Sequence, residues 1–180
     1  MAEYHFDEAA ATRAVDFIEK FCTHVKGELG GKPFLLEDWQ KDDIIRPLFG
    51  WKKADGLRKF RTCYVEIPRK NGKSNLSAAI ALYMLFADGE PGAEVISAAG
   101  DRNQANIVFS LAQEMVHNNK HLSERAKVLR NTIEYKSSFY KSISAEASTK
   151  HGFNCHAVIF DELHTQQNRN LFDVLTTSTG

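Results

Sequence analysis

The sequence predicts an α/β fold in which helices flank a mainly parallel β-sheet. Three observations favour this fold class. Short runs of apolar and β-branched residues alternate with longer amphipathic segments. The run at 156–160 is almost continuously apolar, as expected for a strand covered on both faces. A loop with two basic residues at 68–72 directly follows another such run and leads into a helix, and ligands of doubly wound sheets bind beyond such strand ends.

The first fifty residues predict two helices. One is expected over 7–26, because Asp7 is a suitable N-cap and apolar residues recur at helical spacing. Glycines at positions 27, 30 and 31 end it. A second helix is expected over 37–49, and a charged connection covers 52–61.

Strands and helices then alternate along the chain, according to the period of their apolar residues. Two short extended segments at 132–135 and 142–145 form either a hairpin or two further strands. The other strands are expected at 62–67, 94–99 and 156–160, and the other helices from Lys73 onward and over 102–117.

The composition is that of one globular domain. The chain has 180 residues, of which 43% are hydrophobic and 26% charged, enough for a sizeable core. Lys and Arg together number 23, as do Asp and Glu, so the formal net charge is zero. DNA-binding domains are usually basic. If this chain acts on DNA, it therefore needs a local basic patch, or several copies arranged around the DNA.

The cysteines and apolar segments predict a cytoplasmic protein. Cys22, Cys63 and Cys155 are widely spaced and form no CxxC pair, so neither a disulfide framework nor a zinc site is indicated. The first residues lack the basic and apolar regions of a signal peptide. The longest apolar stretch, around 78–87, is too short to cross a membrane.

The segment 68–74 has the chemistry of a phosphate-binding loop. Gly72 allows close backbone approach to a phosphate, Lys73 adds a positive charge, and Ser74 offers a hydroxyl to Mg²⁺. The full pattern has a Gly where this chain has Ile67, so the first turn must form differently. The simpler alternative is a helix start on a lysine-rich surface. The strand before the loop and the amphipathic helix after it favour phosphate binding.

Two carboxylates follow the apolar run 156–160. Asp161 can accept hydrogen bonds from Mg²⁺-bound water opposite Ser74, and Glu162 can orient and polarise an attacking water. On their own they fit two solvated carboxylates at a strand end. Together with the loop, they indicate ATP hydrolysis by a P-loop NTPase of the ASCE type, in which a catalytic Glu follows the metal-binding Asp and an extra strand lies between the two motifs.

These residues resemble the large terminase subunit of tailed phages, in its HK97-like branch. The segment 67–74 is similar to that branch's variant phosphate loop, including the departure at the first Gly, and 158–164 is similar to its acidic motif. The two motifs are specific as a pair. The resemblance covers the chain from about residue 34 to its last residue.

Three further similarities are supportive. The segment 36–40 looks like the family's adenine-binding element, in which Gln40 reads the adenine edge beside Trp39. The alternative is a core Trp beside a surface amide. The segment 98–105 resembles the stretch after the family's second strand, and 176–180 resembles its coupling motif, which links the γ-phosphate state to domain movement.

The resemblance implies an ATP and Mg²⁺ site. Its catalytic residues are Glu162, Lys73 and Arg69, its metal-binding residues are Ser74 and Asp161, and its coupling residues are Thr176, Thr177 and Ser178. Its nucleotide-binding residues are Pro68, Arg69, Lys70, Asn71, Gly72, Lys73, Ser74, Trp39 and Gln40.

Two basic residues, Arg69 and Lys150, each have two possible roles. Arg69 either contacts the phosphates or is a solvated cation. Lys150 stands where the family often has an Arg that acts on the neighbouring subunit's nucleotide, and Lys is a poorer phosphate clamp than Arg. The alternative for Lys150 is an exposed loop residue.

The resemblance also implies an assembly. Family members form a ring, usually of five subunits, around double-stranded DNA at the portal protein, and work with a small terminase subunit. They also carry a C-terminal nuclease domain, whereas this chain stops at the coupling motif. We therefore expect an N-terminal helical segment at 1–31, an ATPase domain at 32–180 that is incomplete at its C-terminus, and no nuclease domain.

Two other functions fit the same motifs. A helicase-like DNA-dependent ATPase also has an acidic pair followed two residues later by His, although no second motor domain with its own arginines is present. A truncated terminase fragment without turnover is the other alternative. Lys136, Lys141 and Lys150 are candidate DNA contacts as scattered basic residues, and the alternative for each is an ordinary surface lysine.

Overall fold

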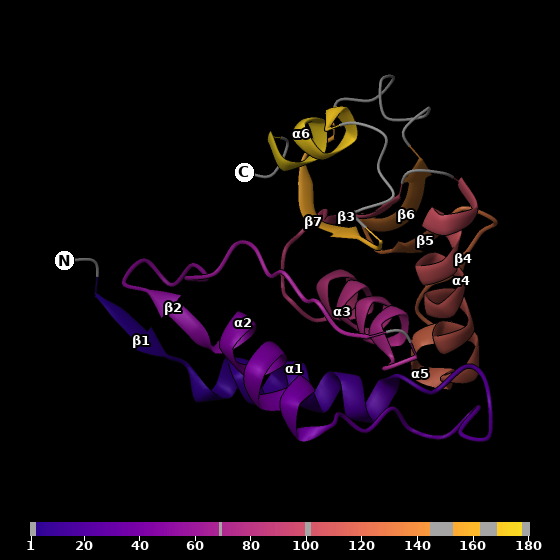
Figure 1. The fold of residues 1–180 in the computed structure, drawn as a ribbon, viewed down its shortest axis with the longest axis horizontal. Helices are drawn as coiled ribbons and strands as arrows, with labels where there is room; N and C mark the ends of the chain where they lie inside the picture. The colour runs from indigo at the N-terminus through magenta and orange to yellow at the C-terminus, as the bar shows by residue number, and fades with distance from the viewer. Residues whose placement is uncertain (1–2, 69, 100–101, 145–152, 163–168, 178–180) are drawn as a thin grey trace.

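The computed structural model describes residues 3–68, 70–99, 102–144, 153–162 and 169–177. Their helices and strands form a central sheet with helices on both faces (Figure 1). The predicted α/β class is confirmed.

A mixed five-stranded sheet runs in the order β4-β5-β6-β3-β7. β3 (Glu94–Ala99) lies between β6 (Ser138–Ser144) and β7 (Cys155–Phe160) and is parallel to both. β5 (Thr132–Tyr135) and β4 (Lys127–Val128) continue the sheet beyond β6 in antiparallel orientation. The parallel part of the sheet is therefore β6-β3-β7, and its carboxyl ends lie on one side.

Helices cover the two faces of this sheet unequally (Figure 1). α3 (Lys73–Phe86) and α4 (Arg102–Asn118) pack on one face, and α6 (Asn170–Thr177) packs on the other. Successive β3 side chains serve the two cores in turn, because side chains alternate along a strand. Val95 lies in the cluster with α3 and α4, and Ile96 in the cluster with α6.

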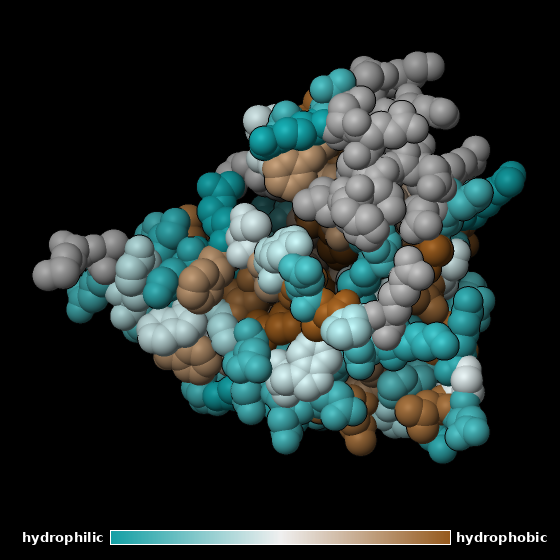
Figure 2. Space-filling model, in the orientation of Figure 1, coloured by the Kyte–Doolittle hydropathy of each residue, from teal (hydrophilic) through white to brown (hydrophobic). Residues whose placement is uncertain are grey.

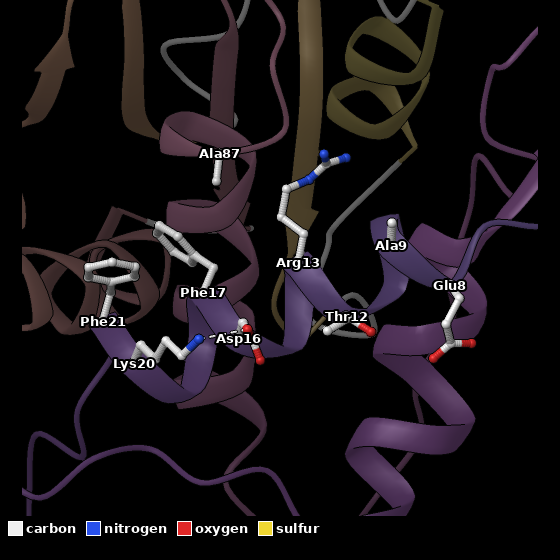
Figure 3. Close-up of a pocket in the computed structure, with 9 residues that line it drawn as sticks. All are labelled: Glu8, Ala9, Thr12, Arg13, Asp16, Phe17, Lys20, Phe21 and Ala87. Carbon is white, nitrogen blue, oxygen red and sulfur yellow. Dashed lines mark hydrogen bonds and ion pairs between the residues drawn. The ribbon is translucent and has the colours of Figure 1, made fainter.

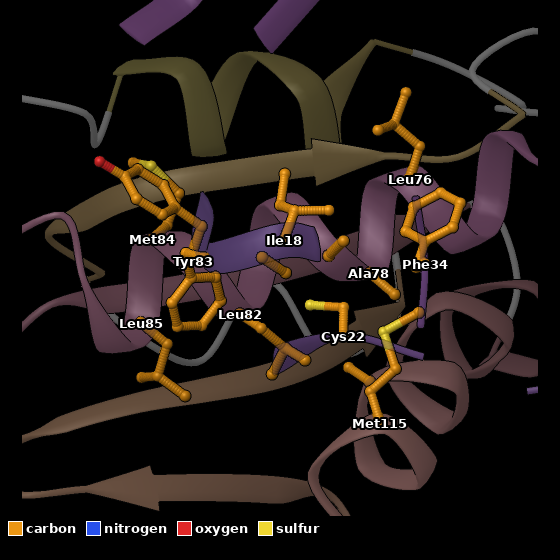
Figure 4. Close-up of a cluster of buried hydrophobic side chains, with 14 of the residues drawn as sticks. Ile18, Cys22, Phe34, Leu76, Ala78, Leu82, Tyr83, Met84, Leu85 and Met115 are labelled. Carbon is orange, nitrogen blue, oxygen red and sulfur yellow. The ribbon is translucent and has the colours of Figure 1, made fainter. Parts of the chain in front are cut away.

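α1 (Glu8–Phe21) covers α3 from outside. Figure 4 shows Ile18 and Cys22 in the same apolar cluster as Leu82 of α3 and Met115 of α4. Ile18, Leu82 and Met115 are completely buried. Each side chain of this size contributes roughly 1.5–3 kcal/mol relative to exposure. The N-terminal segment and the sheet therefore share one core.

The strand expected at 62–67 is wrong. These residues form no ladder with any described strand, and the Tyr64 side chain is 74% exposed. The outer edge of β7 pairs with no strand within the described ranges. β-propensity reports how well a residue fits beside a pleated neighbour. The sequence supplies strand-forming residues here, but the described sheet supplies no neighbour for them.

Both early helices differ from their expected bounds. α1 ends at Phe21 rather than 26, because Cys22 is extended and its carbonyl accepts the Phe34 N–H at 3.0 Å. The helix expected over 37–49 contains the π-helix η1 (Gln40–Ile45), followed by α2 (Arg46–Gly50). Pro47 has no N–H to donate to an α-helical partner, and the wider turn before it accommodates this.

Several smaller predictions are confirmed. Asp7 is the N-cap of α1 and accepts the Ala10 N–H at 3.0 Å. β5 and β6 form the hairpin, although β6 begins earlier than expected. Strand 94–99 has the predicted bounds. The sequence did not predict the short elements β1 (Tyr4–Phe6), β2 (Trp51–Lys53) and α5 (Lys120–Ser123), or β4 and α6.

No helix within the described ranges is long and apolar enough to cross a bilayer.

A buried carboxylate joins three parts of the fold. Asp88 follows α3 and accepts two hydrogen bonds from Arg58 Nη1, at 2.7 and 2.6 Å. Nε2 of His156, in β7, lies 2.7 Å from the same carboxylate. Burial alone would raise the pKa of Asp88, but the His156 hydrogen bond and the Arg58 guanidinium outweigh burial and lower that pKa.

Replacing Asp88 with Asn is expected to destabilise the fold by about 3 kcal/mol, because it leaves the largely buried Arg58 guanidinium without its counter-charge. The pKa of Asp88 is lower in the folded chain than in the unfolded chain. Its contribution is therefore present above about pH 4 and lost as pH falls further. Urea unfolding of both proteins at pH 3 and pH 7 measures this.

Asp16→Asn is the matched control, because Asp16 pairs with Lys20 on the exposed surface of α1. That pair is worth at most about 1 kcal/mol. An Asp88→Asn loss as small as that of the control, or equal losses at the two pH values, would contradict the assignment.

Candidate functional site

The loop before α3 has two residues in the left-handed region. Gly72 has φ 75° and ψ 9° and forms the N-cap of α3. Lys70 has φ 69°, which is costly for a residue with a side chain. The Asn71 side-chain amide donates to the Pro68 carbonyl at 3.1 Å and closes the turn. The chain therefore enters α3 through a left-handed Gly72, as expected, but the loop follows no strand of the described sheet.

The two sequence motifs meet in space. Lys73 is the first residue of α3, and its Nζ lies 2.5 Å from a carboxylate oxygen of Glu162 and 3.6 Å from one of Asp161. Asp161 and Glu162 directly follow β7. The carboxyl end of a core strand and the amino end of a helix thus face one another, as the sequence predicted.

Ser74 completes a set of oxygen atoms suited to Mg²⁺. Its hydroxyl donates to the Asp161 carboxylate at 3.3 Å, and the Asp161 side chain is 6% exposed. Hydroxyl and carboxylate oxygens are ligands that Mg²⁺ accepts alongside water and phosphate. The donor set therefore fits the predicted metal.

The electrostatics keep Lys73 charged. The Glu162 hydrogen bond and the two nearby carboxylates raise the pKa of Lys73, against the opposing effect of burial. Glu162 itself has φ 51°, and its N–H donates to the Asp161 side chain at 3.1 Å. Backbone strain of this kind costs about 1–3 kcal/mol and gathers at functional sites. In this conformation the Glu162 side chain reaches Lys73.

Gln40 lies against the same loop. Its Nε2 is 3.7 Å from the point where a Cβ on Gly72 would stand. Its side chain is buried, and its Oε1 accepts the Glu37 N–H at 3.0 Å. Gln40 is therefore not a surface amide, whereas the neighbouring Trp39 is half-buried against the main core.

Other predicted site residues lie elsewhere or cannot be placed. Arg69, Lys150 and Ser178 fall outside the described residues. Thr176 and Thr177 end α6, and their hydroxyls donate to carbonyls of that helix. Figure 1 shows α6 at the top of the molecule, beyond β7 from α3. Thr176 and Thr177 therefore lie on a helix that covers the opposite face of the sheet from α3.

A groove of about 890 Å³ runs along α1, away from this pair. Figure 3 shows Arg13 and Phe17 on its walls, with Ala87 from the region after α3. None of its lining residues is a predicted site residue.

Sequence reasoning missed what anchors the acidic strand. His156, near the start of β7, is tied through Asp88 to the end of α3. α3 and β7 are thereby linked at the ends remote from the Lys73–Glu162 pair. An imidazole in an otherwise apolar strand was the only sign of this link in the sequence.

Comparisons with known proteins find similar chains. The family model described as terminase large subunit, ATPase domain, matches residues 38–179. The terminase large subunit of Enterobacteria phage HK97 is 34% identical over 182 aligned positions, which cover 93% of this chain and 34% of that protein. This chain therefore spans about a third of that relative's length.

Two solved structures are similar. The crystal structure of the HK97 bacteriophage large terminase has a TM-score of 0.79 and 31% identity, covering 93% of this chain and 34% of that one. A mutant of the Thermus phage P74-26 large terminase ATPase domain has a TM-score of 0.51 and 21% identity, covering 61% of this chain and 51% of that one. At that identity, the second match supports the fold alone.

Proposed function

Because this chain belongs to the family of terminase large subunits, whose ATPase domain it matches, we propose that it binds ATP with Mg²⁺ and hydrolyses it to drive double-stranded DNA into a phage procapsid. The observation that carries the proposal is the meeting of the two motifs. Lys73 and Ser74, at the start of α3, lie within hydrogen-bond reach of Glu162 and Asp161 after β7.

The loop is suited to hold the triphosphate. The amino end of α3 carries about half a positive charge, and the N–H groups of its first turn have no helical partner. Lys73 adds a full charge beside them. Lys70, Asn71 and Gly72 shape the turn so that the backbone can approach the phosphates. Magnesium held by Ser74 and Asp161 would neutralise charge on the phosphates.

Glu162 is suited to act on the attacking water. A phosphate at the loop competes with Glu162 for the Lys73 ammonium, because both are anions that accept its hydrogen bonds. Once Lys73 turns to the phosphate, the carboxylate can accept a proton from water and orient it. The reaction needs positioning and charge stabilisation, and no side-chain nucleophile.

The remaining residues have supporting roles in the proposal. Gln40 contacts the adenine edge from its place beside Gly72, and Trp39 packs beside it. Arg69 contacts the phosphates, and Lys150 acts on a neighbouring subunit's nucleotide. Thr176, Thr177 and Ser178 couple the nucleotide state to movement.

We propose the family's assembly for this chain as well. Five subunits form a ring around DNA at the portal protein, in the host cytoplasm, with a small terminase subunit as partner. Residues 32–180 supply the ATPase domain, and residues 1–31 supply a helical segment that packs on it through α1.

The proposal is tested by ATP hydrolysis of the purified chain with and without Mg²⁺, and with duplex or single-stranded DNA added. We expect Mg²⁺-dependent hydrolysis that duplex DNA stimulates more than single strands do. Stimulation by single strands alone favours a helicase-like ATPase. Absence of both ATP binding and hydrolysis identifies an inactive fragment and refutes the proposal.

A further inference from the structure

A small hairpin projects from the helical layer (Figure 1). β1 pairs with β2 in antiparallel register, with Phe6 opposite Trp51. The chain then turns, so that the Lys59 N–H donates to the Trp51 carbonyl at 2.8 Å. We call β1, β2 and residues 54–61 the basic hairpin. Its backbone is thus fixed on both sides of β2.

The basic hairpin concentrates positive charge in a chain whose formal net charge is zero. Residues 51–61 contain one acid, Asp55, whose side chain accepts the Leu57 N–H within the turn. Arg58 turns inward to Asp88. The five cations of this stretch are Lys52, Lys53, Arg58, Lys59 and Arg61.

Three of these cations have no carboxylate partner among the described residues. Lys52, Lys53 and Lys59 form no ion pair with a carboxylate in the part of the chain that the structure describes. Lysines on the helices do have carboxylate partners, since Lys20 pairs with Asp16 and Lys120 pairs with Glu124. An excess of unpaired cations on one feature of a neutral chain attracts a polyanion.

Aromatic rings hold one of these ammonium groups in place. Lys59 Nζ lies 4.6 Å from the ring centre of Tyr4 and 5.0 Å from those of Trp51 and Phe60. Cation–π contacts fix the position of the ammonium and leave it able to donate hydrogen bonds to an incoming anion. Tyr4 and Phe60 are themselves exposed. Lys59 is therefore a positioned cation, which lowers the entropy lost when it binds.

The three lysines lie on both faces of the hairpin. Lys53 is opposite Tyr4 and Lys59 is opposite Trp51, so they share the aromatic face, whereas Lys52 is opposite His5 on the other. Figure 2 shows hydrophilic residues on this arm beside near-neutral and hydrophobic ones. Residues 51–61 include no Asn, Gln, Ser or Thr, the side chains that read base edges beside Arg and Lys. Such a surface offers mainly cations, and cations bind phosphates.

We propose that Lys52, Lys53 and Lys59 of the basic hairpin bind the phosphate backbone of double-stranded DNA without sequence preference. The choice of duplex DNA as the polyanion rests on the proposed function, whereas the need for a polyanion rests on the charge of the hairpin. This surface is separate from the Lys73–Glu162 pair. DNA binding by the hairpin does not require a nucleotide.

The test is the salt dependence of duplex binding, measured by fluorescence anisotropy without nucleotide. Each neutralised phosphate adds about 0.9 to the slope of log affinity against log salt. Replacing Lys52, Lys53 and Lys59 together with Ala should lower that slope by about 2.7 and weaken binding at least about tenfold at low salt. The triple Lys→Arg variant keeps the charge and should bind like the parent chain.

The matched control replaces Lys20, Lys41 and Lys120 with Ala, because each of these lysines already has a carboxylate partner. This variant loses the same charge and should keep the parent slope. Thermal melts of all variants separate loss of binding from loss of folding.

Several results would overturn the hairpin assignment. They are equal loss in the control, an unchanged slope in the hairpin variant, loss in a Lys136→Ala and Lys141→Ala variant instead, or binding of single strands only. An absence of duplex binding by the parent chain at low salt would point to an acidic protein partner and also refute it. If the chain failed to hydrolyse ATP but the hairpin variant still showed the expected loss of DNA binding, only the proposed function would be refuted.

Discussion

Replacing Lys73 with Ala is expected to weaken ATP binding by at least about 100-fold, equivalent to about 2.7 kcal/mol. Lys73 Nζ lies 2.5 Å from a carboxylate oxygen of Glu162 and 3.6 Å from one of Asp161, and Lys73 stands at the first position of α3. Its ammonium makes charge-assisted hydrogen bonds to phosphates, which are among the strongest that proteins form. Calorimetric titration with ATP and Mg²⁺ measures the loss.

Lys20→Ala is the control for this substitution. Lys20 also pairs with a carboxylate, at 2.7 Å, but on α1 and away from the loop. It should leave ATP affinity within about twofold. Removing Lys73 also removes a cation beside Asp161 and Glu162, so the fold is checked by thermal unfolding. Unchanged ATP affinity in a folded Lys73→Ala chain would remove the loop from the account.

Replacing Glu162 with Gln is expected to lower the rate of ATP hydrolysis by about 10²–10⁴-fold while ATP binding stays within a few fold. Gln keeps the size of the side chain and its hydrogen bonds but cannot accept a proton at neutral pH. Gln carries a Cβ as Glu does, so the positive φ at position 162 costs the same in the variant as in the parent chain. Steady-state hydrolysis and equilibrium binding, measured on the same preparation, separate the two effects.

The control for hydrolysis is Glu124→Gln, which removes an exposed carboxylate paired with Lys120. It should hydrolyse ATP at the parent rate. If Glu162→Gln retained the parent rate, another group would have to orient the water. If it lost ATP binding as well, Glu162 would be holding the loop rather than acting in catalysis.

The parts of the site that the sequence predicted are those in which local chemistry decides the structure. Gly72 precedes Lys73 because a left-handed residue is needed to turn the chain into α3. Asp161 follows an apolar strand, and strand ends on one side of a parallel sheet meet the helix starts beside them. These rules act over a few residues, so the pattern of residue types is sufficient to predict them.

The features that the sequence did not predict depend on contacts between residues that are far apart in the sequence. The run at 62–67 has strand-forming residues, but pairing requires a neighbour that the described sheet does not provide. The π-helix that carries Gln40 depends on how Pro47 is accommodated. The bond between Asp88 and His156 joins residues that are 68 positions apart. No pattern within a short window contains these contacts.

The sequence did not predict the basic hairpin, for a different reason. β1 and β2 have three residues each, too few to show an alternating pattern. Their pairing brings Tyr4 next to Lys53, although most of the N-terminal region separates the two residues in the sequence. The charge excess of 51–61 was visible in the sequence, but without the fold it indicated only a charged connection.

The claim on which the account depends is that the loop and the acidic strand hold one Mg²⁺–ATP complex. The most direct measurement is a double-mutant cycle of Ser74→Ala and Asp161→Asn, with the affinity for Mg²⁺ in the presence of ATP as the readout. Two ligands of one metal ion should be coupled by at least about 1 kcal/mol. Effects that add within about 0.5 kcal/mol would show that these residues serve separate sites and would contradict the account.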